Sequence, residues 1–256
     1  MRPIPNRPAV LGVFAAVMIG LAPAIPAAAA DSAPASPPDA AAVEKIVHDY
    51  LLKNPEVVVK ALEAYKAKAQ ADEMAEQRRA IDSRRDEIFK DPLSAVGGNP
   101  DGDVTLVEFF DYRCGVCKRT HPVIEELVKR DGRIRMVYKE WPILGPDSVY
   151  ASQAAIASRK QDAGKYVAFH NALMTARRVT RDSVLAIAAK TGLDTKRLER
   201  DMMAPEVEQI IKRNYSLAQA LKINGTPSFI IGNTLLYGAR DLETLRQVVS
   251  DARGKS

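Results

Sequence analysis

The stretch EFFDYRCGVCKR, residues 108–119, contains the only two cysteines of the chain, Cys114 and Cys117. It continues a hydrophobic run that begins at Val104, and the residues that follow Cys114 have the apolar spacing of a helix. Two thiols three residues apart, where a strand passes into a helix, can open and close a small disulfide. The sequence therefore predicts redox chemistry at this stretch.

The segments on either side of the cysteine pair predict an α/β fold. Strand, helix and strand in succession are typical of a parallel crossover unit. A long helical region follows, and the chain then returns to strand periodicity in a hairpin with a Gly-Asn turn. The predicted elements are a buried strand (104–110), a helix (114–130), a strand (134–139), a helical insertion (about 146–222), two hairpin strands (228–231 and 234–237) and a final helix (241–252).

The first thirty residues have the layout of a secretory signal peptide. A basic start precedes the apolar run Ala9–Leu21, and three alanines end the segment at Ala30. An uncleaved membrane anchor is the alternative, but the run is short for a span and two prolines follow it. Cleavage leaves 35 basic and 32 acidic residues, a net charge of +3, which is too mild to indicate a nucleic-acid partner.

Export implies an oxidising compartment, in which disulfides persist. Two cysteines are too few for a structural disulfide framework, so the pair is interpreted as catalytic. Half of a zinc site is the competing interpretation. It needs about two further ligands, and the three histidines, His48, His121 and His170, do not supply a convincing set. No metal and no other cofactor is predicted.

Residues 31–91 are interpreted as a flexible leader followed by an N-terminal helical stalk. Apolar residues share one helical face from Val43 to Leu51. No Pro or Gly follows Pro55 until Pro92, so residues 55–89 could form one helix of about 50 Å. An apolar residue occurs every seven positions at Ala67, Met74, Ile81 and Ile88, which is a weak coiled-coil pattern. A charged, solvent-exposed helix, or one packed on its own domain, remains the alternative to self-association.

Residues 92–256 form the predicted catalytic domain, and its first part, Pro92–Asp103, is interpreted as a linker with Gly-Gly and Asp-Gly turn signals. At the start of a helix, Cys114 would lie beside unpaired backbone N–H groups that favour its thiolate. Neighbouring basic residues add positive charge. Cys117, one turn into the helix, would be shielded and act as the resolving thiol.

Two further positions point to the same site. Glu108 interrupts an apolar strand six residues before Cys114, and a buried acid there could exchange a proton with Cys117. An outward-facing strand residue is the alternative. Thr226-Pro227 precedes a strand and is a candidate for a cis bond, although most such bonds are trans. A proline without an N–H leaves an edge where a substrate backbone could pair.

Together these motifs resemble the DsbA-like branch of the thioredoxin superfamily, and most of all its ScsC-type (suppressor of copper sensitivity) periplasmic members. The resemblance covers about residues 43–253. It implies a thioredoxin-like fold, Cys114 as nucleophile, Pro227 as the cis-proline with Thr226 contacting substrate, and Glu108 as the buried acid. The sequences that carry it are EFFDYRCGVCKR (108–119), KEWPILGP (139–146), NGTPSF (224–229) and LLKNPE (51–56).

The resemblance implies a periplasmic disulfide isomerase or reductase. The Gly-Val pair between the cysteines lacks a histidine to stabilise the thiolate, which favours a milder oxidant than the Pro-His oxidases, and threonine before the proline resembles the isomerases. Val116 stands where tyrosine is common in such motifs, so the resemblance does not fix the reduction potential. The expected partners are cysteine-containing or misfolded exported proteins and a DsbD- or ScsB-like membrane protein, and the expected assembly is a homotrimer. A DsbA-like oxidase and a Cu(I)-binding copper-tolerance protein are the alternatives.

Overall fold

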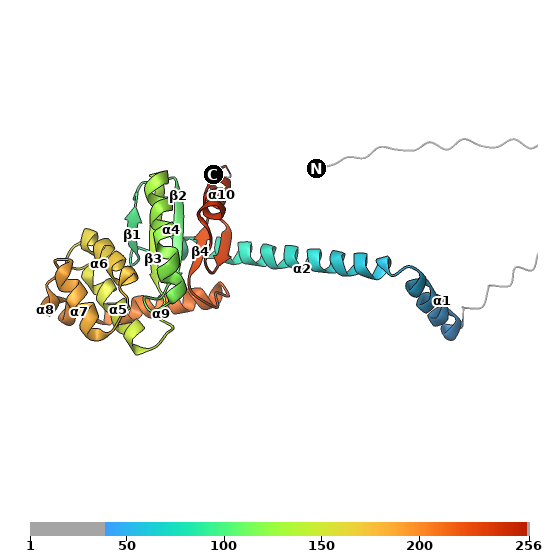
Figure 1. Ribbon diagram of the computed structural model, residues 1–256, viewed down its shortest axis with the longest axis horizontal. Helices are drawn as coiled ribbons and strands as arrows, with labels where there is room; N and C mark the ends of the chain where they lie inside the picture. Colours follow the sequence, from blue (N-terminus) through green and yellow to red (C-terminus); the bar gives the residue numbers. More distant parts are fainter. Residues whose placement is uncertain (1–38, 255–256) are drawn as a thin grey trace, which may run out of the picture. The chain divides into compact units, whose positions relative to one another are not determined.

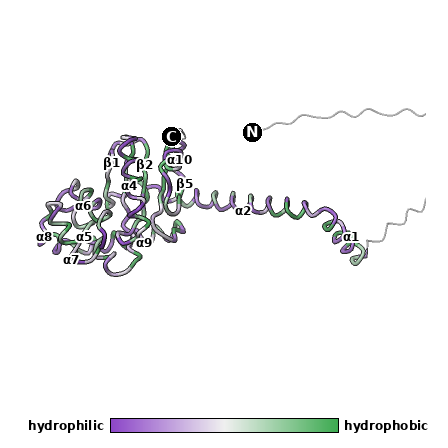
Figure 2. Tube along the Cα trace, viewed as in Figure 1, coloured by the Kyte–Doolittle hydropathy of each residue, from purple (hydrophilic) through white to green (hydrophobic). Residues whose placement is uncertain are grey.

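The computed structural model describes residues 39–254, which divide after Lys60 into two compact units. The expected signal peptide, residues 1–30, lies outside the described residues. In the first unit, α1 exposes its apolar side chains, among them Ile46 and Leu52. In Figure 2, α2 is largely hydrophilic, whereas β2 (Val104–Phe110) is hydrophobic. The helices of the N-terminal region are α1 (Ala40–Lys53), α2 (Glu56–Ser83) and α3 (Arg85–Phe89).

The second unit is built on one mixed sheet with strand order β1-β3-β2-β4-β5 (Figure 1). β2 and β3 are parallel and joined by α4, which confirms the predicted crossover unit, while β1, β4 and β5 pair antiparallel to their neighbours. The strands are β1 (Ala95–Gly98), β2 (Val104–Phe110), β3 (Ile134–Glu140), β4 (Ser228–Ile231) and β5 (Thr234–Tyr237).

Helices cover both faces of this sheet, and five of them form the insertion between β3 and β4. Side chains alternate along β2, so Leu106 and Phe110 join a core with α4, α10 and the insertion, whereas Val107 and Phe109 pack against the opposite core. The helices are α4 (Gly115–Asp131), α5 (Pro146–Ser158), α6 (Ala163–Thr175), α7 (Arg181–Lys190), α8 (Thr195–Met202), α9 (Pro205–Ala220) and α10 (Leu242–Arg253).

Two expectations about the region before β2 need correction. The predicted linker contains β1, which pairs with β3 from Ala95 opposite Tyr138 to Gly98 opposite Arg135. The single helix expected over residues 55–89 is interrupted at Arg84, whose φ of −126° is not helical. The last two positions of the seven-residue spacing, Ile81 and Ile88, are fully buried in the core against β2 and α9. The chain uses them for its own packing.

Candidate functional site

Cys114 lies where β2 passes into α4, as the sequence predicts. It is the N-cap of α4, and its Sγ accepts a hydrogen bond from the backbone N–H of Cys117 at 3.3 Å. Both cysteines are free thiols in this structure. The N-cap position gives a sulfur at Cys114 the unpaired N–H groups and the positive end of the helix dipole.

These surroundings separate the acidities of the two thiols. The hydrogen bond from the Cys117 thiol, assisted by the Thr226 side chain and by backbone N–H groups, lowers the pKa of Cys114 to about 5 against the opposing effect of burial. The same hydrogen bond, burial and the charge of Glu108 raise the pKa of Cys117 above its ordinary value. At neutral pH Cys114 is therefore a thiolate and Cys117 a thiol.

Glu108 lies on the sheet face that α4 covers, because it is two residues from both Leu106 and Phe110 along β2 and therefore points to the same side. Its side chain is 1% exposed, which confirms the interpretation of a buried acid and makes the outward-facing alternative wrong. Burial, and then the negative charge of Cys114, raise its pKa to about 8. A carboxyl group with this pKa can take up and release a proton near neutral pH.

The Thr226-Pro227 bond is cis, which confirms the candidate cis-proline. Pro227 comes immediately before β4, which pairs antiparallel with β2, so β4 begins beside the end of β2, close to the start of α4. The Cys114 thiol, when protonated, donates a hydrogen bond to the Thr226 carbonyl at 3.3 Å. The fold thus brings Cys114, Thr226 and Pro227 together from segments more than a hundred residues apart in the sequence.

Sequence reasoning missed Asp111, a buried carboxylate three residues before Cys114. One of its oxygens accepts a hydrogen bond from the Arg113 N–H at 2.7 Å, and the other accepts from the N–H groups of Ile143 and Leu144 at 2.8 and 2.9 Å. It therefore fixes the loop after β3 beside the cysteines. The available signal is the aspartate in a turn between strand and helix, where its side chain binds the backbone two residues on.

The loop that Asp111 fixes presents two apolar side chains to solvent. Ile143 is 38% exposed and Leu144 is 45% exposed. Arg113 donates a hydrogen bond from Nη1 to the Leu144 carbonyl at 2.9 Å, so its guanidinium also anchors this loop. The result is a small apolar surface next to the thiols.

Lys118, which the sequence indicates only as a positive charge near the cysteines, also has a structural role. The Lys118 ammonium donates hydrogen bonds to the carbonyls of Leu173, Met174 and Ala176 at the end of α6, which joins the catalytic helix to the insertion. Burial lowers the pKa of Lys118 to about 8. Its charge still lies close enough to the cysteines to interact with them.

Within the described part of the chain, the three histidines form no metal site with the cysteine pair. His48 is on α1, in the first compact unit. His170 is buried and packs against aromatic rings, as expected from its apolar helix face, and His121 is also buried. Among residues 39–254, no three His, Cys, Asp or Glu side chains are grouped to hold a metal ion, and none of the helices is long and apolar enough to cross a membrane.

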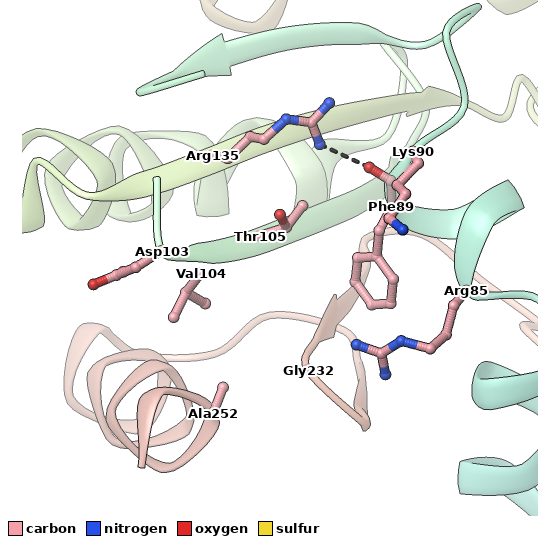
Figure 3. A pocket seen from close by; sticks show the side chains of 9 residues that line it. All are labelled: Arg85, Phe89, Lys90, Asp103, Val104, Thr105, Arg135, Gly232 and Ala252. Carbon is pink, nitrogen blue, oxygen red and sulfur yellow. Dashed lines mark hydrogen bonds between the residues drawn. The ribbon is translucent and has the colours of Figure 1, made fainter. Parts of the chain in front are cut away.

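A pocket of about 470 Å³ lies at the other end of β2 from the cysteines (Figure 3). Arg85, Lys90 and Arg135 line it, together with Val104 at the start of β2. Arg135 donates a hydrogen bond to the Phe89 carbonyl at 2.8 Å and so joins α3 to the sheet. None of the predicted site residues lines this pocket.

Two family models match the chain. The model of the DSBA-like thioredoxin domain matches residues 105–250, and the model of the N-terminal domain of the copper resistance protein ScsC matches residues 39–72. The first match spans β2 to α10, and therefore contains the cysteine pair, the insertion and the cis-proline. The second covers α1 and the first part of α2.

Three solved structures illustrate the likeness. A thioredoxin-like oxidoreductase from Silicibacter pomeroyi DSS-3 is 48% identical, with a TM-score of 0.65 over 67% of this chain and 99% of its own. A linker-deletion mutant of Proteus mirabilis ScsC is 29% identical, with a TM-score of 0.67 over 86% and 98%. The thiol-disulfide exchange protein α-DsbA2 of Wolbachia pipientis is 33% identical, with a TM-score of 0.65 over 68% and 95%.

Proposed function

The chain belongs to the DsbA-like thioredoxin domain family, and on that premise we propose that it is an exported disulfide isomerase or reductase. Family membership supports thiol–disulfide oxidoreductase activity. The observation that carries the proposal is the position of Cys114, a low-pKa thiolate at a helix N-terminus, 3.3 Å from the carbonyl that precedes a cis-proline. We place the reaction in the periplasm.

Cys114 is the proposed nucleophile. Its thiolate attacks one sulfur of a substrate disulfide, the substrate S–S bond breaks, and the other substrate sulfur leaves as a thiolate that takes up a proton from solvent. In isomerisation, a thiolate of the same substrate then attacks the mixed disulfide, forms a new substrate disulfide and returns Cys114 as a thiolate. That cycle transfers no net electrons.

Cys117 is the proposed resolving thiol. In reduction, its thiol gives its proton to the Glu108 carboxylate and the resulting thiolate attacks Sγ of Cys114. A Cys114–Cys117 disulfide forms and the substrate sulfur is released as a thiolate, so the substrate gains two electrons and the protein loses two. A membrane redox partner similar to DsbD or ScsB would then supply two electrons to restore the dithiol.

Substrates are proposed to dock between Pro227 and the loop after β3. Thr226 and Pro227 present backbone beside Cys114, to which an extended substrate segment can pair. Ile143 and Leu144 add an exposed apolar surface that suits the apolar segments of misfolded proteins. Cysteine-containing exported proteins that have not reached their native disulfides fit both features.

An oxidase remains the second candidate, because the hydrogen bond from the Cys117 thiol, with the Thr226 side chain and backbone N–H groups, lowers the pKa of Cys114 even without a histidine between the cysteines. A pKa of about 5 lies between the values of about 3.5 for DsbA and about 7 for thioredoxin. Since stabilising the thiolate makes a disulfide more oxidising, we infer a reduction potential between about −270 and −120 mV, the values of thioredoxin and DsbA.

A refolding assay separates the two candidates. We expect the reduced protein to restore activity to ribonuclease with scrambled disulfides, because Cys114 can form and release mixed disulfides without net oxidation. The yield of active ribonuclease over time is the measurement, with a Cys114→Ser variant as control. Failure of the reduced protein, together with rapid oxidation of reduced ribonuclease by the oxidised protein, would replace the isomerase with the oxidase.

We also propose that residues 31–91 assemble the chain into a homotrimer. The likeness of residues 39–72 to the ScsC N-terminal domain supports this, as do the apolar side chains that α1 exposes. Ile46 is 68% exposed and Leu52 is 70% exposed, so a partner surface would remove considerable apolar area from water. Several active sites would then face one substrate, which raises the effective thiol concentration.

Removing residues up to Lys60 is expected to convert the trimer into monomers that keep their thiol chemistry. The chain should begin at Ala61 and not at Pro92, because removal of the fully buried Ile81 and Ile88 would open the core. Sedimentation of the mature and shortened chains measures the assembly, and alkylation of Cys114 checks that the site is intact. The same molecular state for both chains would exclude residues 31–60 as the assembly element.

A further inference from the structure

A second pocket, of about 170 Å³, leads to the buried carboxyl group of the site. Glu108 lines it from β2, His121 from α4 and His170 from α6, and Glu125 lies on α4 one turn beyond His121. Glu108 is 1% exposed, whereas the side chain of Glu125 is 51% exposed. The pocket therefore joins the acid beneath the cysteines to the surface between α4 and α6.

Each of the two histidines of this pocket has one ring nitrogen without a hydrogen-bond partner among the described residues. His121 and His170 are 4% and 1% exposed, and Nε2 of each makes no hydrogen bond to any residue from 39 to 254. Nearly all buried polar atoms in folded proteins are hydrogen-bonded, often to water. One water occupies about 30 Å³ in the liquid, so the pocket has room for several that could bind these nitrogens.

The polar groups follow one another from the interior to the surface. The imidazole rings of His170 and His121 have centroids 5.4 Å apart, and Nε2 of His121 lies 3.8 Å from a carboxylate oxygen of Glu125. Nδ1 of His170 is hydrogen-bonded to the Tyr112 hydroxyl at 3.1 Å. This bond holds the His170 ring, while its other nitrogen stays available to water.

We propose that this pocket is a proton path, in which water and the imidazoles of His121 and His170 carry protons between Glu108 and solvent at Glu125. The inference rests on the proposed function, since Glu108 receives the proton of Cys117 in each resolving step. A neutral imidazole can accept a proton on one nitrogen and release one from the other, which makes His121 suitable for a relay. His170, whose Nδ1 bonds the Tyr112 hydroxyl, takes up and returns the proton at Nε2. The mouth of the path lies along α4, away from the surface where substrate covers Cys114.

The charges around the path fit a relay of neutral rings. Burial lowers the pKa of both histidines, with Lys118 adding to the effect at each and Glu125 opposing it at His121. Lys129 from α4 and Tyr138 from β3 complete the titratable groups that line the pocket, and burial raises the pKa of Tyr138. Tyr166 from α6 stacks on His170 and is buried and un-ionised.

The path matters most below pH 8. There Glu108, with a pKa of about 8, is mostly protonated and must first release its own proton before it can accept that of Cys117. Above pH 8 it is already ionised when Cys117 needs a base. Blocking the path should therefore slow resolution at pH 7 more than at pH 9.

The test follows both thiol steps in the full chain with one probe, the aromatic disulfide dithionitrobenzoate. Attack by Cys114 releases one coloured thiolate, and attack by Cys117 on the mixed disulfide releases a second. In a His121→Ala variant we expect the first release to keep its wild-type rate and the second to slow on the order of tenfold at pH 7, within the range of general acid–base effects. Added imidazole, which can enter the enlarged pocket, should restore the second rate.

A His121→Gln variant keeps polar contacts with water but cannot relay a proton by exchanging tautomers, so it should show the slow second release without a cavity. Lys129→Gln, at the rim of the pocket, is the matched control and should behave as wild type. Wild-type second rates in both His121 variants, or a slow second rate in His121→Ala that imidazole does not restore, would overturn the proton path. Loss of the first release in the wild-type protein would instead contradict the proposed function.

Discussion

Replacing Cys117 with serine is expected to stop turnover and to leave Cys114 joined to its substrate as a stable mixed disulfide. Cys114 keeps its helix N-terminus and the backbone N–H at residue 117, so it still attacks. The serine hydroxyl cannot displace a sulfur, and without the resolving thiol the complex persists. Non-reducing electrophoresis with a disulfide-bonded substrate should show the covalent complex for Cys117→Ser and none for Cys114→Ser.

The pH dependence of Cys114 in the same variant tests the cause of its low pKa. Serine can still donate a hydrogen bond to the Cys114 sulfur, so alkylation should rise with pH through a midpoint near the pKa of about 5. In Cys117→Ala the side-chain donor is lost, and the midpoint should move upward towards the ordinary thiol value of about 8.5. Equal midpoints for serine and alanine would contradict the role of this hydrogen bond, and absence of the trapped complex would contradict Cys117 as the resolving thiol.

The sign of the linked stability follows from the same shift. The pKa of Cys114 is lower in the folded protein than in the unfolded chain, so ionisation of this thiol favours the folded state. This contribution is complete above the unfolded pKa and is lost as the pH falls through about 5. The dithiol protein should therefore lose stability relative to a Cys114→Ser variant as the pH falls from the unfolded thiol pKa of about 8.5 to about 5. Denaturation at a series of pH values measures this loss.

The sequence correctly predicted those strands and helices for which the spacing of apolar residues and the turn-forming residues indicate the same structure. The hairpin strands 228–231 and 234–237 were expected with their observed bounds, because Gly232 allows the positive φ of 57° that the turn needs. Cys114 at the helix N-terminus was predicted on the same grounds. These features depend on local chemistry that a single segment contains.

The strand β1 was missed because its own residues do not favour a strand. Gly97 and Gly98 indicate a turn, yet both pair with β3, and Gly98 does so with a φ of 64° that glycine readily adopts. A Cβ at Gly97 would lie 2.7 Å from the Tyr138 hydroxyl oxygen and 2.9 to 3.2 Å from atoms of its ring, so glycine allows the two strands to approach over that side chain. A contact with a residue forty positions away cannot be read from local composition.

The burial of Ile81 and Ile88 has a similar explanation. A seven-residue spacing places apolar side chains on one helical stripe, but it does not identify what covers that stripe. Here β2 and α9 cover the last two positions, whereas Met74, one heptad earlier, is 57% exposed. Asp111 was missed for the same reason, because two of its three hydrogen-bond donors come from residues 143 and 144.

The second large effect is expected at Lys139, a buried lysine that ties the end of the N-terminal helices to the sheet. It is 1% exposed, and its ammonium donates hydrogen bonds of 2.9 Å to the Asp91 carboxylate and to the Glu87 carbonyl. Lys139→Met fills a similar volume but leaves Asp91, which is 7% exposed, without its closest counter-ion. Breaking a buried pair in this way costs about 3–5 kcal/mol of the free energy of unfolding.

Denaturant unfolding of the full chain measures this loss of stability, and two further variants test whether it comes from the unpaired buried charge. Lys212→Met breaks an exposed pair with Glu208 and should cost at most about 1 kcal/mol, so it controls for the loss of a lysine charge. Lys139→Met combined with Asp91→Leu removes both charges and should recover much of the lost stability, since no unpaired carboxylate remains. If Lys139→Met were no more destabilising than Lys212→Met, the buried pair would not be what holds the segment between α3 and β1 against the sheet. If Lys139→Met caused a large loss that Asp91→Leu did not recover, the loss would come from packing of the lysine stem and from its hydrogen bond to the Glu87 carbonyl. The charge of Asp91 would then contribute little.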